Sequence, residues 1–314
     1  LANETTSKKL AELGEKELEI GKDFNEFKTI ADDLLARMAK DGHKDLRLKV
    51  PQHNINKIQN LAISATEYMT TVVGAGVSGA AAGFAVYSGV MAFAAASTGT
   101  PIAALSGAAA YNATMAAIGG GSLAAGGWGM AGGAMVLGGA VVAPLIAIAG
   151  WAYDSHAEKA LNNAYQSSRE VTAAVEKMNA AEAQLTKVQQ YVNSIYESIT
   201  RMHSVFIQHY FEPLKAMHAV IVERHEKNIT TEISESEEIM AIIDHGYELA
   251  AIMTDVITTP LFKPVTQENG EAVIEDGVIQ LQTDSNGMNL LNKEILDEKL
   301  AASDSEFDAF SSRI

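Results

Sequence analysis

The chain is organised around one apolar stretch, which begins VVGAGVSGAAAGFAVYSGVMAFAAA at residues 72–96 and ends LAAGGWGMAGGAMVLGGAVVAPLIAIAGWAY at residues 123–153. Residues 68–153 contain no Asp, Glu, Lys, Arg or His. A surface helix of a globular protein keeps a polar face for water, and about 20 consecutive apolar residues are enough to cross a bilayer. The sequence therefore predicts that residues 71–153 form a membrane-inserting helical region.

Turn-forming residues divide this stretch into three runs. Pro101 ends the first run, because proline lacks an N–H and disfavours the helical conformation of Thr100. The three glycines at 119–121 end the second run, and the third continues to Tyr153. The first and third runs are long enough to span a bilayer, whereas the middle run is of marginal length.

Small and aromatic residues in the stretch suggest how such helices would pack. Small residues four positions apart allow two helix backbones to approach closely in lipid. The predicted helix-packing residues are Gly79, Gly83, Gly129 and Gly133. Large amphipathic rings favour the membrane–water boundary. The predicted interface residues are Trp128, Trp151 and Tyr153.

Two alternatives to insertion stay open for this stretch. It can be the buried core of a helical protein, or it can be sequestered in one form of the protein and released in another. Each glycine lowers helix propensity in water by about 1 kcal/mol relative to alanine. The density of glycine therefore favours a membrane region over an ordinary helical core.

Composition limits the function classes further. The 314 residues have a net charge of −16 and a mean hydropathy of +0.04. This average is too polar for a multi-pass transporter, and the negative charge argues against general binding to nucleic acids or anionic lipids. The absence of cysteine excludes a disulfide scaffold and a thiol catalyst. The polar N-terminus shows no secretory signal, although the chain does not begin with Met and a removed signal stays open.

Amphipathic helices are predicted on both sides of the apolar stretch. In residues 1–70, an apolar stripe runs from Thr6 to Lys40, Gly42 ends that helix, and Pro51 starts a second one. In residues 154–260, apolar residues alternate at three- and four-residue spacings, which favours a long coiled-coil helix. The predicted oligomer seam consists of Leu185, Val188, Val192 and Ile195.

Residues 261–314 form the last predicted segment. Asn269-Gly270 and Asp276-Gly277 are typical turn pairs between short strands, so they predict a small β-hairpin. A short helix is expected from Met288 to Ala301, followed by an acidic, mobile tail. The predicted fold class is all-α, with long helices flanking a central apolar region and this hairpin near the C-terminus.

No pattern in the sequence indicates catalysis, a cofactor or a metal ion. His203, His209, His218 and His225 form the only local group of histidines, and their spacings do not match a zinc motif. We expect them to be ordinary histidines on a helix surface, although a pH sensor in that region stays open. The sequence therefore predicts a protein that is not an enzyme.

One run carries a family resemblance: LSGAAAYNATMAAIGGGSLAAGGWGMAGGAMVLGGAVVAP, from Leu105 to Pro144. It resembles the glycine-rich block of the channel effectors of the Hailong anti-phage system. The resemblance implies an oligomeric, gated channel in the bacterial inner membrane, controlled by a nucleotide or oligonucleotide made by a companion nucleotidyltransferase. The only basic cluster near the long helix that could serve as a ligand patch is Arg201, Lys215, Arg224 and Lys227.

Two other classes compete with a resident channel. Long helices around one apolar hairpin also resemble the secreted α-helical pore-forming toxins. A membrane-anchored coiled-coil scaffold without a pore is the third class. The main hypothesis from the sequence is an oligomeric pore or channel that disrupts a membrane, with the lipid bilayer and further copies of the chain as its partners.

Overall fold

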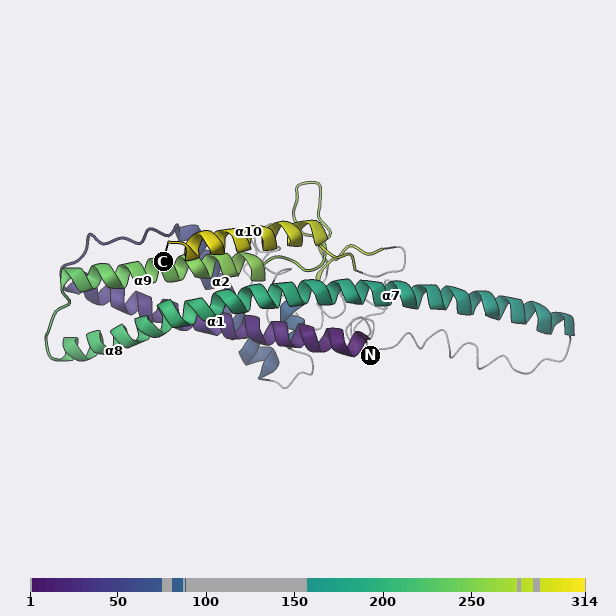
Figure 1. The fold of residues 1–314 in the computed structure, drawn as a ribbon, viewed down its shortest axis with the longest axis horizontal. Helices are drawn as coiled ribbons and strands as arrows, with labels where there is room; N and C mark the ends of the chain where they lie inside the picture. Colours follow the sequence, from purple (N-terminus) through teal and green to yellow (C-terminus); the bar gives the residue numbers. More distant parts are fainter. Residues whose placement is uncertain are drawn as a thin grey trace.

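The computed structural model describes residues 2–74, 81–86, 88, 157–275, 278–284 and 289–313, and this part of the chain is all-α. Its helices lie side by side as one elongated bundle (Figure 1). They are α1 (Ala2–Lys40), α2 (Gln52–Tyr68), α7 (Ala157–Phe206), α8 (Glu212–Glu226), α9 (Ile233–Ile257) and α10 (Lys293–Ser311). Two five-residue π-helical turns, η1 (Met69–Val73) and η4 (Ile207–Phe211), continue α2 and α7.

The N-terminal helices begin and end where local chemistry requires. Helix α1 ends at Lys40, and Gly42 follows with a φ of 103°, a left-handed conformation that glycine adopts without strain. Pro51 is the residue before α2, and its fixed φ of −58° suits a helix start. Both boundaries confirm the helices predicted for residues 1–70.

A proline shapes the junction between α7 and α8. Pro213 has no N–H, so it cannot donate the α-helical hydrogen bond to the carbonyl four residues earlier. The chain passes through η4 just before this proline, and α8 starts at Glu212 with Pro213 in its first turn. The two helices therefore form one nearly continuous rod, which Figure 1 shows along the whole length of the molecule.

The core of the bundle is an aromatic cluster that joins three elements. Phe27 of α1 lies 5.1 Å from Phe206 of α7 and 5.3 Å from Tyr247 of α9, measured between ring centroids. Phe24 contacts Phe206 edge to face at 5.3 Å. Gly246 allows this approach, because a Cβ at that position would overlap the Phe27 ring. Burial of such rings supplies a large part of a core's stability.

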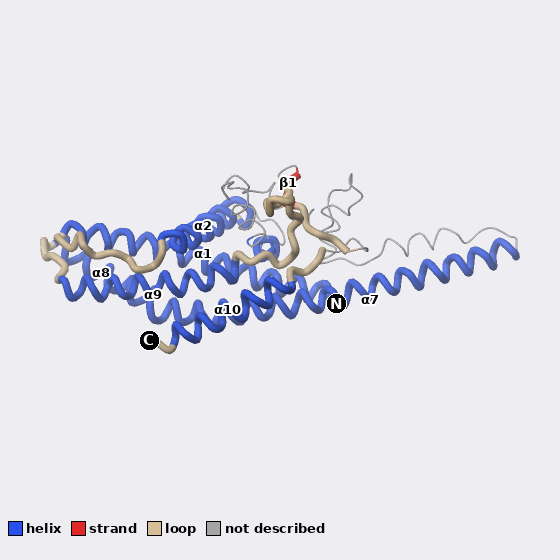
Figure 2. The backbone as a smooth tube through the Cα atoms, turned by 90° about the horizontal axis from the view of Figure 1, so that it is seen from above, coloured by secondary structure: helices blue, strands red, loops and turns tan. Residues whose placement is uncertain are grey.

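Helix α7 extends beyond the other described helices of the bundle (Figure 1). Helices α1, α9 and α10 all contact it. In two perpendicular views, its N-terminal half runs beyond the N-terminus of α1, and no other described helix reaches that half (Figures 1 and 2). We call residues 157–183 the projecting half of α7.

One described part of the apolar stretch lies inside the bundle. Residues 81–86 are helical, and the side chains of Ala82, Phe84, Ala85 and Val86 belong to the core. Phe84 lies 5.0 Å from Tyr68 of α2, between ring centroids. Gly14 of α1 makes this packing possible, because a Cβ there would overlap the carbonyl oxygen of Ala81. Gly83, predicted to contact another helix in lipid, is therefore buried within the protein core.

The prediction of a membrane-inserting pore or channel is wrong for the structure described. None of the helices in the described ranges combines the length and the apolar character that a membrane crossing requires. This finding also removes the support for a place in the inner membrane, for the toxin alternative and for a membrane-anchored scaffold. Most of the apolar stretch, together with Gly79, Gly129, Gly133, Trp128, Trp151 and Tyr153, lies outside the described residues.

The C-terminal segment differs from the prediction in two ways. Strands β1 (Ile274–Glu275) and β2 (Val278–Ile279) pair antiparallel but have two residues each, which does not support the predicted β-hairpin as an element of the fold. Helix α10 continues to Ser311, through most of the predicted mobile tail. It does so because Phe307 and Phe310 are buried: Arg201 lies over the Phe307 ring, and Phe310 contacts Tyr210.

The close approach at Gly14 gives a first testable prediction. Replacing a helix glycine by alanine normally stabilises a helix by about 1 kcal/mol. Gly14→Ala should instead lower the free energy of unfolding by about 1 to 3 kcal/mol, because the new methyl group meets the Ala81 backbone. Urea unfolding followed by circular dichroism measures the change. Glu15→Ala, at an exposed neighbouring position, is the control and should change stability little. A stabilising Gly14→Ala would show that residues 81–86 do not pack against α1.

Candidate functional site

Three histidine–aspartate contacts connect α1 to the α7–α8 rod. The His203 Nε2 atom lies 2.9 Å from an Asp23 oxygen, and the corresponding distances are 2.8 Å for His218 to Asp33 and 2.8 Å for His225 to Asp41. Asp23 and Asp33 lie on α1 and Asp41 directly follows its last residue, and the histidines occur in the same order along the rod. We call this series the histidine–aspartate ladder.

Sequence reasoning missed the ladder. Each partner lies 180 or more positions away in the chain, so spacing along one helix carries no sign of it. The expectation of ordinary surface histidines is wrong for His203, which is buried. His218 and His225 are half-buried and held by their carboxylate partners.

Two carboxylates of the ladder, Asp33 and Asp41, have lowered pKa values. A hydrogen bond from Arg37 at 2.6 Å holds the pKa of Asp33 below its usual value, against partial burial, and the contact with His218 adds to this effect. Partial burial alone would raise the pKa of Asp41. The backbone N–H and hydroxyl of Thr231, together with His225, outweigh it and lower the pKa. Both aspartates therefore stay ionised at neutral pH, and Asp41 fastens the end of α1 to the loop between α8 and α9.

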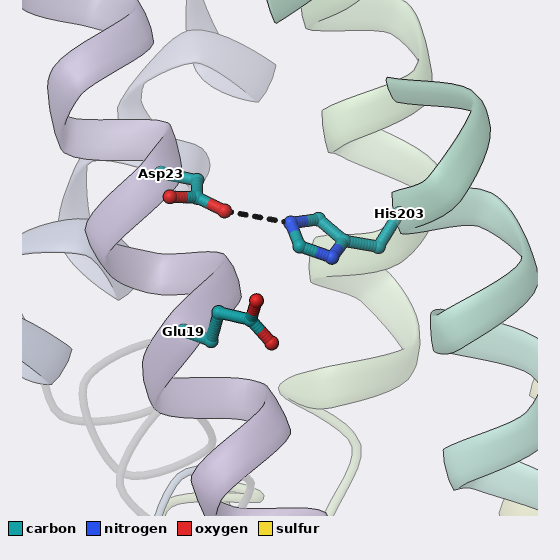
Figure 3. A group of neighbouring side chains, drawn as sticks. All are labelled: Glu19, Asp23 and His203. Carbon is teal, nitrogen blue, oxygen red and sulfur yellow. Dashed lines mark hydrogen bonds and ion pairs between the residues drawn. The ribbon is translucent and has the colours of Figure 1, made fainter. Parts of the chain in front are cut away.

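The contact between His203 and Asp23 has a second acidic residue, Glu19, beside it. Glu19 lies one helical turn before Asp23 on α1, so both carboxylates face the imidazole of His203 across the helix interface (Figure 3). Each residue can offer one ligand atom such that the three atoms lie within 4.8 Å of one another. The side-chain exposure rises from 4% for His203 to 17% for Asp23 and 55% for Glu19. The group is thus anchored in the core and open on one side.

A second acidic group lies entirely inside the bundle. The carboxyl group of Glu17 accepts a hydrogen bond from Ser88 Oγ at 3.2 Å, and the same hydroxyl lies 3.2 Å from the carbonyl oxygen of Ile257. Burial raises the pKa of Glu17 well above its ordinary value, and the bond from Ser88 lowers it only in part. Glu17 therefore favours the protonated, uncharged form, at the place where α1, α9 and the start of the apolar stretch meet.

The projecting half of α7 is exposed wherever its surface is described. Val171 is 41% exposed and Val175 is 48% exposed. Contacts between α7 and the bundle begin near Gln184, whose side chain donates a hydrogen bond to the carbonyl oxygen of Asn289 at 3.0 Å. From there on the predicted oligomer seam, Leu185, Val188, Val192 and Ile195, is buried in the core of the same chain.

The four basic residues predicted as a ligand patch are not gathered into one site. Each is paired with an acidic residue of the same chain: Arg201 with Asp304, Lys215 with Glu26, Arg224 with Glu235 and Lys227 with Glu223. Arg201 lies on α7, and the other three lie on α8 or directly after it. Each of the four pairs with a different acidic residue. The structure thus gives the predicted patch no geometric support.

A surface hollow of about 480 Å³ lies between the end of α1 and the loop at residues 43–50. Two of its basic side chains already bind backbone carbonyl groups. Arg47 donates to Lys44 and Leu46, and the His43 ring lies 2.8 Å from the carbonyl oxygen of Thr231. These contacts hold the loop in place, and we assign no ligand to the hollow.

Comparisons with protein-family models, with curated proteins and with solved structures found no match for this chain. The resemblance to Hailong channel effectors therefore has no support from them. Any functional argument depends on the geometry of the described residues.

The buried Glu17 gives a second prediction. The stability that this group contributes is full below its ordinary pKa of 4.5 and falls as the pH rises toward its higher folded value. The slope is at most about 1.4 kcal/mol per pH unit. Glu17→Gln keeps the shape and removes the charge, so the variant should exceed the wild type in unfolding free energy by an amount that grows with pH.

Urea unfolding at several pH values between about 5 and 8 measures this difference. The control is Glu15→Gln, which removes an exposed carboxylate two positions away and should leave the slope nearly unchanged. A constant difference between the Glu17→Gln variant and the wild type across the pH range would show that Glu17 is ionised in the fold.

Proposed function

We propose that this protein is a helical scaffold that self-associates through the projecting half of α7. The observation that carries the proposal is the exposure of Val171 and Val175 on a helix whose apolar stripe is buried from Leu185 onwards. The occupant of this face, in the proposal, is the same segment of a second copy of the chain.

The apolar stripe of α7 supports an association between helices. It continues at three- and four-residue spacings from the bundle into the projecting half, where Val171 and Val175 fall four residues apart. In the bundle the same stripe, at Val188 and Val192, packs against its own chain and is almost fully buried. A helix with such a stripe buries it against another helix when one is available. The projecting half is about 40 Å long, enough for several layers of such contacts.

Charge supports a second copy of the chain as the partner. Residues 157–183 contain four acidic and three basic side chains, whereas the whole chain has a net charge of −16. Two projecting halves can therefore approach one another with little repulsion. Two bundles would bring many negative charges together, and at physiological salt such repulsion acts within roughly 8 Å. The projecting half is thus the part of the molecule where self-association costs least.

The third prediction tests this interface. Replacing Val171 and Val175 together by Asp should weaken self-association by at least about a hundredfold, since burying uncompensated charges costs about 3 kcal/mol or more. Sedimentation velocity over a wide range of protein concentrations measures the assembly. Circular dichroism should show unchanged helix content, because both residues are exposed in a single chain.

Ala180→Asp is the matched control. Ala180 is exposed on the same half of α7 but on the opposite side of the helix from Val171 and Val175. This variant should assemble like the wild type. A wild-type protein that stays monomeric at all concentrations, or a double variant that assembles as well as the wild type, would refute the proposal.

A further inference from the structure

We infer that Glu19, Asp23 and His203 form a binding site for a divalent transition-metal ion at the interface of α1 and α7. The inference is independent of self-association, because the site lies within the bundle half of α7. It goes beyond the sequence expectation, which assigned no metal ligand. Figure 3 shows the three side chains converging from the two helices.

The donor set has the chemistry of a transition-metal site. It combines one imidazole nitrogen with two carboxylate oxygens, a set that suits Zn²⁺ and also Mn²⁺ or Fe²⁺. Three protein ligands leave a coordination position for water, and the exposed side of Glu19 provides access to solvent. The buried side of the group is His203, which the core holds in one orientation. A site with a fixed, buried imidazole and one coordination position open to solvent can exchange its metal ion.

The distances require only a small adjustment. The Nε2 atom of His203 and the Oδ2 atom of Asp23 are 2.9 Å apart, and they must separate to roughly 3.3 Å to share one tetrahedral zinc ion with bonds of about 2.0 to 2.1 Å. One Glu19 oxygen lies within 4.8 Å of a ligand atom of each of the other two residues. Glu19 lies one helical turn from Asp23, and its side chain is exposed. Rotation about the side-chain bonds of Glu19 therefore brings its carboxylate closer to His203 and Asp23 without movement of the helices.

Lys16 is the competitor for this site. Its ammonium group lies 2.9 Å from a Glu19 oxygen, and this is the contact that metal binding must replace. Glu19 is mostly exposed, and such ion pairs contribute at most about 1 kcal/mol. A divalent ion held by three ligands outweighs that contact. The net charge of −16 attracts cations to the protein as a whole.

The contact of His218 with Asp33 in the histidine–aspartate ladder serves as an internal control. His218 and Asp33 make the same type of contact at 2.8 Å, but there Arg37 occupies the place next to the aspartate. A guanidinium group at that position repels a metal ion. The inference therefore distinguishes two similar pairs: the one with a second carboxylate binds metal, and the one with an arginine does not.

The fourth prediction is a titration of the full-length, chelator-treated protein with zinc chloride and, separately, manganese chloride in a calorimeter. The wild type should bind one ion of at least one of these metals. His203→Gln and Asp23→Asn should each weaken binding by at least about tenfold, the size of effect seen when a metal site loses a supporting group. Lys16→Gln should strengthen binding, because it frees the Glu19 carboxylate.

The matched controls are His218→Gln and Asp33→Asn, which should bind like the wild type. Circular dichroism confirms that each variant is folded. The visible absorption of bound Co²⁺ reports directly on the imidazole ligand. Among the histidine variants, only His203→Gln should change this absorption. Three outcomes would overturn the inference: no binding by the wild type, equal losses in the His203 and His218 variants, or no effect of Lys16→Gln.

Discussion

Burial of the apolar face of α1 is the interaction on which the rest of the structure depends. Phe24 and Phe27 on that face meet Phe206 of α7 and Tyr247 of α9, and α1 also packs against α2 and α8. Rings of this size contribute more buried area than any other side chains. The contact of His203 with Asp23 and the neighbouring Glu19 lie on the same helices as these rings, so this packing positions them. The glycines at 14 and 246 matter for the same reason, because they let backbone and rings approach α1 more closely than any other residue would.

The sequence predicts those parts of the fold that local chemistry determines. The end of α1 before Gly42 and the start of α2 after Pro51 follow from backbone preferences of single residues. The long α7 follows from the spacing of its apolar residues. The histidine–aspartate ladder does not follow, because its partners meet only when two helices distant in sequence pack in a particular register. The same limit explains α10: the acidic residues of its last turns suggested a tail, while Phe307 and Phe310 pack against partners from another part of the chain.

The apolar stretch shows how composition and environment can be confused. A long run without charge is compatible with lipid and with a protein core, since both exclude water. Density of glycine favoured lipid, yet one described part of the run, residues 81–86, packs in the core of the bundle. Here the small residues allow close contact with α1, the role that they were expected to play between helices in a membrane. Gly83 is buried in this core, so the surroundings predicted for it were wrong.

The continuity of α7 connects the two halves of the molecule. A 50-residue helix is about 75 Å long and bends only gently unless a proline or a bulge interrupts it. In α7 the π-helical turn and Pro213 come at the C-terminal end, beyond the bundle contacts of Phe206, so no such break separates the projecting half from the half that is packed. The core around Phe27 and the contact of His203 with Asp23 therefore fix the direction in which Val171 and Val175 are presented. A rigid helix transmits a rotation of one half to the other. A rotation of α7 within the bundle would therefore also reorient a partner helix bound to the projecting half.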